Sequence, residues 1–170
     1  MTVSALFCAI ISALSLISIP LGAVPLTLQL FGIYAALYYN RGAEGFVGTV
    51  LYVCLGCIGV PVFSGLRGGV HCLFDTTGGF IFGFILLSGS YCLMYRLLGK
   101  TVFSRVASTA VSLAVFYLSG SLFYAAAYLG GVGAVLPSLV ATVFPFIPFD
   151  ILKIALAMLL SSRLYRHLTL

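Results

Sequence analysis

The chain has 170 residues, of which 62% are hydrophobic and 6% are charged, and its formal net charge at pH 7 is +5. Soluble domains are roughly half apolar and a quarter charged, so this composition excludes a soluble protein and predicts one integral membrane domain over residues 1–170. Basic residues flank membrane helices on the cytoplasmic side, so the positive charge indicates no nucleic-acid partner. The sequence has no GxxxxGK[ST] stretch, and any ATPase must therefore be a separate polypeptide.

Glycine, proline and charged residues divide the sequence into six apolar segments, each expected to be a membrane helix of about 20 residues. In chain order they are 3–19, 26–40, 44–60, 76–97, 103–129 and 148–165. The first lacks the basic start and small-residue cleavage site of a secretory signal, so we expect a retained helix. The stretch 130–147 contains three glycines and two prolines. We expect it to be an outer connection that folds back into the protein.

Basic residues set the expected orientation. With six spans, the connection between the second and third helices, the connection between the fourth and fifth, and the C-terminal end share one face. These places hold Arg41, Arg96, Lys100, Arg105, Arg163 and Arg166. The positive-inside rule makes that face cytoplasmic. The predicted fold class is therefore all-α, with six transmembrane helices and both termini cytoplasmic, in a multi-pass protein of a cell membrane.

The outward-facing connections, 19–29, 59–80 and 130–149, are rich in glycine and proline and contain few polar residues. A solvent-exposed loop would be more hydrophilic. Two interpretations remain open at this point. The loops form a lid over an apolar pocket, or they are tight turns at the membrane interface.

Asp150 and Lys153 are two of the few charged residues, and they lie three positions apart in an otherwise apolar helix. Charged groups inside a membrane are costly and usually face a cavity, a partner or a pathway. Their spacing places both side chains on one helical face. The alternative is a structural pair, in which Asp150 caps the helix and Lys153 extends to the membrane interface. We favour a functional role, because an outward-facing cap needs no lysine beside it.

Further polar and glycine positions are candidates for ligand contacts. Gln29, with Thr27 beside it, either joins two helices or offers a donor and an acceptor to a ligand. Gly78 and Gly79 open the fourth segment and could bring a ligand against bare backbone. Gly79 and Gly83 also form a GxxxG pattern, which favours helix packing, above all for Gly83.

Ala5, Ala9 and Ala13 recur every four residues along the first segment. A stripe of small residues is typical of close helix contact in membranes. The partner is either another helix of this chain or a different subunit. His71, Cys72 and Asp75 are too few ligands to predict a metal site, and neither a cofactor nor a catalytic constellation is predicted.

Four stretches in this order resemble one family: VPLTLQ, LGCIGVPVF, TGGF and FDILK. The resemblance covers the whole chain and is to the BioY family. These are the biotin-specific substrate-binding (S) components of energy-coupling factor (ECF) transporters in prokaryotes. One local departure is that the family often has Gly-Pro-Thr-Gly-Gly where this chain has Phe-Asp-Thr-Thr-Gly-Gly, so Asp75 adds a charge there.

The resemblance implies six helices with both ends cytoplasmic and no enzymatic activity in this chain. It implies that biotin binds in an outward-facing cavity beneath the connection between the first two helices, and that Asp150 and Lys153 contact the biotin. It also implies that Ala5, Ala9 and Ala13 dock on a transmembrane coupling (T) subunit. Two separate ATPase subunits would drive uptake across the prokaryotic cell membrane.

Biotin is a fused ureido–thioether ring system that carries a valerate carboxylate, and such a ligand needs a mainly apolar pocket with a few polar groups. Asp150 can accept hydrogen bonds from the ureido N–H groups. Lys153 can meet the carboxylate, with help from the positive end of the last helix. The alternatives are an S component for another small vitamin and an ion-coupled secondary transporter. The latter would usually show broken helices in symmetry-related halves.

Overall fold

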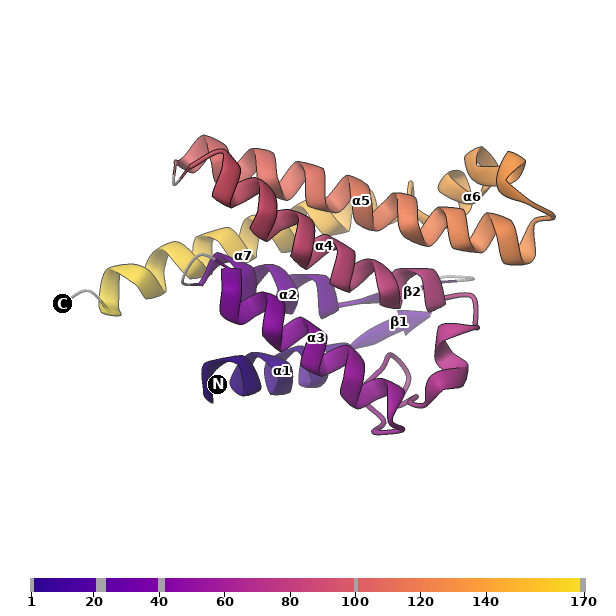
Figure 1. Ribbon diagram of the computed structural model, residues 1–170, viewed down its shortest axis with the longest axis horizontal. Helices are drawn as coiled ribbons and strands as arrows, with labels where there is room; N and C mark the ends of the chain where they lie inside the picture. The colour runs from indigo at the N-terminus through magenta and orange to yellow at the C-terminus, as the bar shows by residue number, and fades with distance from the viewer. Residues whose placement is uncertain (1, 21–23, 40–41, 100, 169–170) are drawn as a thin grey trace.

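The computed structural model describes residues 2–20, 24–39, 42–99 and 101–168 (Figure 1). The described chain is mostly helical, as predicted. Its helices are α1 (Thr2–Ser15), α2 (Gln29–Tyr38), α3 (Ala43–Cys57), α4 (Gly78–Leu97), α5 (Val102–Tyr128), α6 (Val135–Thr142) and α7 (Ile147–Leu168), with short 3-10 turns η2 (Val70–Leu73) and η3 (Val132–Ala134). Two of the basic residues that set the expected orientation, Arg41 and Lys100, lie outside the described residues.

Each of the six predicted segments contains a helix, but the helices differ in length. Among the described residues, α4 and α5 are long and apolar enough to cross a membrane, and α6 with α7 forms a third candidate that is bent by 61° at its break. Helices α1, α2 and α3 are apolar but have 14, 10 and 15 residues. A straight span needs about 20. Helix lengths therefore identify two or three spans, and the six-span topology stays a prediction.

Two outer connections have more regular structure than the sequence indicated. A small antiparallel hairpin, β1 (Ser18–Pro20) with β2 (Pro25–Thr27), joins α1 to α2. Both strands contain proline, which cannot donate to a strand ladder, so the sequence here is typical of a turn. The stretch 130–147 folds back as expected, but it does so as helix α6. Ser138 of α6 is buried and donates a hydrogen bond of 2.9 Å to the Ser121 carbonyl oxygen of α5.

Figure 1 shows how the elements are distributed between the two ends of the molecule. Both chain ends, the turn from α2 to α3 and the turn from α4 to α5 lie toward one end. The hairpin, the connection from α3 to α4 and helix α6 lie toward the other. Arg96 in the last turn of α4 and Arg105 near the start of α5 therefore lie at the same end as the C-terminal part of α7. This is the grouping on which the expected orientation depends.

Helices α4 and α5 form the longest antiparallel pair, and glycines set how closely they approach. A Cβ added at Gly79 would lie 2.3 Å from Phe123 Cβ, and one at Gly83 would lie 2.6 Å from Ser119 Oγ. On the opposite helix, Gly120 accommodates the ring of Phe80, which would lie 2.2 Å from an added Cβ. The packing role predicted for Gly83 is confirmed, and Gly79 has the same role.

We expect Gly79→Ala to lower the stability of the purified protein by about 1–3 kcal/mol, because the new methyl group overpacks a rigid helix contact. The measurement is thermal unfolding in detergent. Gly89→Ala in the same helix is the matched control, because its Cβ would meet nothing closer than 3.6 Å. Equal unfolding temperatures for the two variants would show that α4 and α5 do not depend on the close approach at Gly79.

Candidate ligand-binding site

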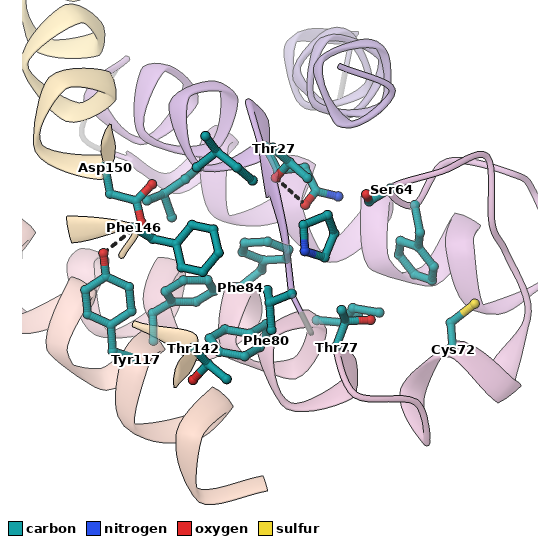
Figure 2. A pocket seen from close by; sticks show the side chains of 18 of the residues that line it. Thr27, Ser64, Cys72, Thr77, Phe80, Phe84, Tyr117, Thr142, Phe146 and Asp150 are labelled. Atoms are coloured by element: carbon teal, nitrogen blue, oxygen red, sulfur yellow. Dashed lines mark hydrogen bonds between the residues drawn. The ribbon is translucent and has the colours of Figure 1, made fainter. Parts of the chain in front are cut away.

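A cavity lies between the hairpin, α2, the connection from α3 to α4, and helices α4 to α7 (Figure 2). The volume of the cavity is about 70 Å³. One water needs roughly 10–15 Å³ by this measure, so the cavity has room for a small organic molecule. The lining residues are Val24, Pro25, Leu26, Thr27, Gln29, Leu30, Phe63, Ser64, Arg67, Cys72, Thr77, Phe80, Ile81, Phe84, Phe116, Tyr117, Thr142, Phe146, Asp150 and Lys153.

The walls of the cavity are mainly aromatic. Phe84 and Phe116 stack with ring centroids 5.1 Å apart, and Phe80 meets Phe116 edge-on at 5.4 Å. The hairpin contributes Val24, Pro25, Leu26 and Thr27 to the lining. This supports the interpretation of the first outer connection as a lid, although Gly22 and Ala23 within it lie outside the described residues. Such walls suit a compact apolar ring system.

Asp150 and Lys153 form a buried ion pair at one end of the cavity. Lys153 Nζ donates to Asp150 Oδ1 over 2.8 Å. The Tyr117 hydroxyl donates to Asp150 Oδ2 over 2.7 Å, as Figure 2 shows. Asp150 is 5% exposed and Lys153 is 7% exposed. Each Asp150 oxygen thus has one donor. Lys153 has three N–H donors, and among the described residues only Asp150 accepts from it.

The structural alternative for these two residues is wrong in both of its details. Helix α7 begins at Ile147, and the Asp150 backbone N–H already bonds to the Phe146 carbonyl oxygen at 2.9 Å. Asp150 therefore lies inside the first turn and is not an N-cap. Lys153 is too buried to extend to a membrane interface. The pair exists, but it faces the cavity.

Gln29 joins two helices, which confirms one of the two roles left open by the sequence. It also lines the cavity, and its contact with a ligand stays a prediction. Its Nε2 donates to the Tyr52 hydroxyl at 2.5 Å, and its Oε1 accepts from Thr27 Oγ1 at 2.9 Å. Tyr52 in turn donates to the Val62 carbonyl oxygen at 3.1 Å, and Ser15 of α1 donates to the same oxygen. This network connects the hairpin side of the cavity with α1, α2 and α3.

Gly78 and Gly79 do not line the cavity, although they are candidates from the sequence. A Cβ at Gly78 would lie 1.9 Å from the Leu73 carbonyl oxygen, and Gly79 packs on α5. Both positions are therefore filled by protein. Their neighbours Thr77 and Phe80 line the cavity instead.

Arg67 is a cavity residue that sequence reasoning missed. A tight turn presents it, because Phe63 and Arg67 pair through their backbones while Gly65 and Leu66 have positive φ angles of 74° and 58°. The ring of Phe63 anchors this turn by filling the space beside Gly56, where a Cβ would lie 2.1 Å from the ring. The Arg67 side chain is 41% exposed. We call this edge of the cavity, at Ser64 and Arg67, the mouth.

A second ion pair lies at the mouth. Arg67 Nη1 donates to Asp75 Oδ2, and Arg67 Nε donates to the Ser64 carbonyl oxygen at 3.3 Å. The Thr76 backbone N–H donates to Asp75 Oδ1 at 2.7 Å. That backbone bond, with the nearby guanidinium, holds the pKa of Asp75 below its usual value, so this carboxylate is ionised at neutral pH. The sequence feature that could have indicated this site is the one arginine in the glycine-rich stretch 59–80.

The alanine stripe of α1 faces away from the rest of the chain. Ala5, Ala9 and Ala13 are exposed, whereas the opposite face of α1, with Cys8 and Ile11, is buried against α2 and α3. The described chain therefore provides no internal partner for the stripe. The partner of the stripe was expected to be either another helix of this chain or a different subunit. The observed packing is consistent only with a partner outside the described chain.

Comparison with known proteins gives a consistent result. A sequence model of the BioY family matches residues 1–169. The biotin transporter BioY of Thermotoga maritima is 35% identical over 94% of this chain and 91% of its own length. The probable biotin transporter BioY of Pyrococcus horikoshii is 34% identical over 94% of this chain and 92% of its own length.

A solved structure shows the same fold. It is a crystal structure of the S-component for biotin from an ECF-type ABC transporter, and it superimposes with a TM-score of 0.82 at 24% sequence identity. The match covers 97% of this chain and 89% of the other. Two relatives that match almost end to end at more than 30% identity, together with the family model, establish the classification. The chain belongs to the BioY family.

Proposed function

We propose that this protein is the biotin-capturing S component of an ECF-type ABC transporter in a prokaryotic cell membrane. The observation that carries the proposal is one aromatic-walled cavity with a charged cluster at each end. Biotin has the matching shape, with an apolar fused ring, a polar ureido group at one end and a carboxylate at the other. The proposed topology is six spans with both termini on the cytoplasmic side.

The buried cluster of Asp150, Lys153 and Tyr117 suits the ureido end. The ureido group has two N–H donors and one carbonyl acceptor, and it is neutral. Asp150 offers an ionised acceptor, while Lys153 retains donors beyond the one that it gives to Asp150. An ion pair with no net charge therefore meets a neutral ligand end, and no uncompensated charge is buried.

The mouth suits the carboxylate better than Lys153 does. The Lys153 side chain is 9% exposed and is already paired, so a ligand carboxylate there would add a third, uncompensated charge to a buried cluster. The Arg67 side chain is 41% exposed, and a carboxylate beside it would keep part of its hydration. Figure 2 shows Asp150 and Tyr117 at the opposite end of the cavity from Ser64, which belongs to the turn of Arg67. We therefore assign the carboxylate to Arg67, in place of the sequence-based assignment to Lys153.

Uptake then requires other subunits. The exposed stripe of Ala5, Ala9 and Ala13 is the proposed docking face for a transmembrane coupling (T) subunit, since small residues let helices approach closely. Two ATPase subunits of the same module would drive the cycle. In this scheme the chain binds and delivers biotin and performs no catalysis.

The proposal is tested by equilibrium binding of labelled biotin to the purified protein, with lipoate, thiamine and biotin amide as competitors. We expect saturable binding that unlabelled biotin displaces and that lipoate and thiamine do not. If lipoate or thiamine displaces the labelled biotin at concentrations at which unlabelled biotin does not, the biotin assignment is wrong. That result would favour an S component for another vitamin.

We expect Arg67→Gln to weaken biotin binding by roughly 10- to 150-fold while the affinity for biotin amide stays unchanged. Hydrogen bonds to charged groups contribute about 1.5–3 kcal/mol, which corresponds to this range. Arg96→Gln removes one positive charge from the exposed opposite end of α4 and is the matched control. If Arg67→Gln weakens biotin and its amide equally, the carboxylate does not bind at the mouth.

A further inference from the structure

Asp75 forms an ion pair with Arg67, the residue to which we assign the ligand's carboxylate. It is one of only three acidic residues in the sequence, and it accepts from Arg67 Nη1 at the mouth. Its other carboxylate oxygen is fixed by the Thr76 backbone N–H at 2.7 Å. Its backbone carbonyl oxygen accepts from the Gly78 N–H at 2.8 Å, at the start of α4. The carboxylate is thus held in place by the Thr76 backbone N–H and by the arginine.

The guanidinium of Arg67 has donors left for a second carboxylate. Of its five N–H groups, one on Nη1 bonds to Asp75 and that on Nε bonds to the Ser64 carbonyl oxygen. Among the described residues, no other acceptor is bonded to this guanidinium. A ligand carboxylate can therefore share the guanidinium with Asp75 or replace it. In both cases two negative charges compete for one positive charge.

The ion pair is not needed to hold the loop in place. The turn is closed by the backbone pairing of Phe63 with Arg67, and the Gly69 N–H bonds to the Gly56 carbonyl oxygen at 2.6 Å. The Tyr128 hydroxyl also donates to the Phe74 carbonyl oxygen at 3.0 Å. Half-exposed ion pairs contribute little to stability. Loss of the Asp75 charge should therefore leave the loop folded.

We propose that Asp75 is an internal substitute for the ligand's carboxylate, which holds Arg67 while the cavity is empty and competes for it when the ligand is bound. The inference rests on the proposed binding of the carboxylate at Arg67. Its consequence is that Asp75 lowers the affinity for the anionic ligand and gives Arg67 a partner when the ligand leaves. Asp75 thus sets how strongly this site distinguishes an anionic ligand from its neutral analogue.

The test compares Asp75→Asn with the wild-type protein for biotin and for biotin amide. Asn keeps the shape of the side chain and an oxygen for the Thr76 N–H, but it removes the charge. Without that charge the mouth changes from neutral to positive, so biotin should bind roughly three- to tenfold more tightly at low salt. Biotin amide, which has no charge, should bind as it does to the wild type.

Two further variants complete the experiment. Glu44→Gln removes one negative charge in the first turn of α3, at the opposite end of the molecule, and should leave both affinities unchanged. In an Arg67→Gln background, Asp75→Asn should give a clearly smaller gain for biotin, because it then relieves only the repulsion between the two carboxylates and releases no guanidinium. Weaker binding of both ligands by Asp75→Asn would show that the ion pair is a structural link, and unchanged biotin binding would show that no competition exists.

The proposed function and the inference fail in different ways. If the folded wild-type protein binds no biotin, the proposed function is wrong and the inference falls with it. If the wild type binds biotin and Asp75→Asn binds it with the same affinity, only the inference is overturned. An equally large gain in the Arg67→Gln background would also overturn it, because the gain would then not pass through Arg67.

Discussion

Asp150→Asn is expected to weaken biotin binding by roughly a hundredfold to several thousandfold. Removing one charge of a buried pair costs about 3–5 kcal/mol, because the other charge is left uncompensated, and that cost converts to this range of affinity. Both partners are almost completely buried, at 5% and 7% exposure, so water offers little compensation. Biotin and biotin amide should weaken alike, since Asp150 is assigned to the ureido end. The measurement is equilibrium binding of both ligands to the purified variant.

Tyr117→Phe is a milder change at the same site and serves as the comparison for Asp150→Asn. It removes the 2.7 Å hydrogen bond to Asp150 but leaves the ion pair intact. A net effect of about 1 kcal/mol, or roughly fivefold in affinity, is expected from one hydrogen bond. Each variant is first checked by its thermal unfolding, since the pair also contributes to the folded state. A folded Asp150→Asn protein with wild-type affinity would show that the pair does not contact the ligand.

Lys153→Met separates the two assignments of the carboxylate. Met keeps most of the apolar stem and removes the charge, so binding of both ligands should weaken strongly. The preference for biotin over biotin amide should remain, because that preference is assigned to Arg67. If Lys153→Met erases the preference and Arg67→Gln retains it, the carboxylate binds at Lys153 and the assignment to the mouth is wrong.

Much of the fold follows from local sequence patterns. Apolar runs between glycine, proline and charged residues predict the six segments that contain α1 to α5 and α7. The i, i+3 spacing of Asp150 and Lys153 places them together on one face, and the structure confirms their contact. The alanine stripe of α1 is exposed, as a docking face requires. These features depend on residues close together in the chain, which sequence reasoning treats well.

The remaining features depend on contacts between distant segments. Tyr117 is 33 positions from Asp150, and no local pattern connects them. Arg67 enters the site only because a turn with positive φ at Leu66 directs it there, and Leu rarely adopts that conformation. The sequence makes Gly78 and Gly79 candidate ligand contacts, but Leu73 and Phe123 fill the space beside them. Such placements follow from tertiary packing, which a single sequence does not display.

Ala9→Trp is expected to reduce ATP-driven biotin uptake to the background level while biotin affinity stays at its wild-type value. Ala9 lies in the middle of the exposed stripe, so an indole ring there does not disturb the packing of α1 on α2 and α3. A partner helix that approaches the small side chains of the stripe would meet the ring and be kept at a distance. Capture and uptake should therefore separate in this variant.

The measurement uses membrane vesicles that contain the complete transporter, with uptake of labelled biotin followed after ATP is supplied. Leu93→Trp is the matched control, because Leu93 is 59% exposed on α4 and lies away from the stripe. It should transport at the wild-type rate. Biotin binding to both purified variants shows that each cavity is intact. Wild-type uptake by Ala9→Trp would mean that the coupling subunit docks on another face of the protein, whereas loss of uptake with full binding would locate docking at α1.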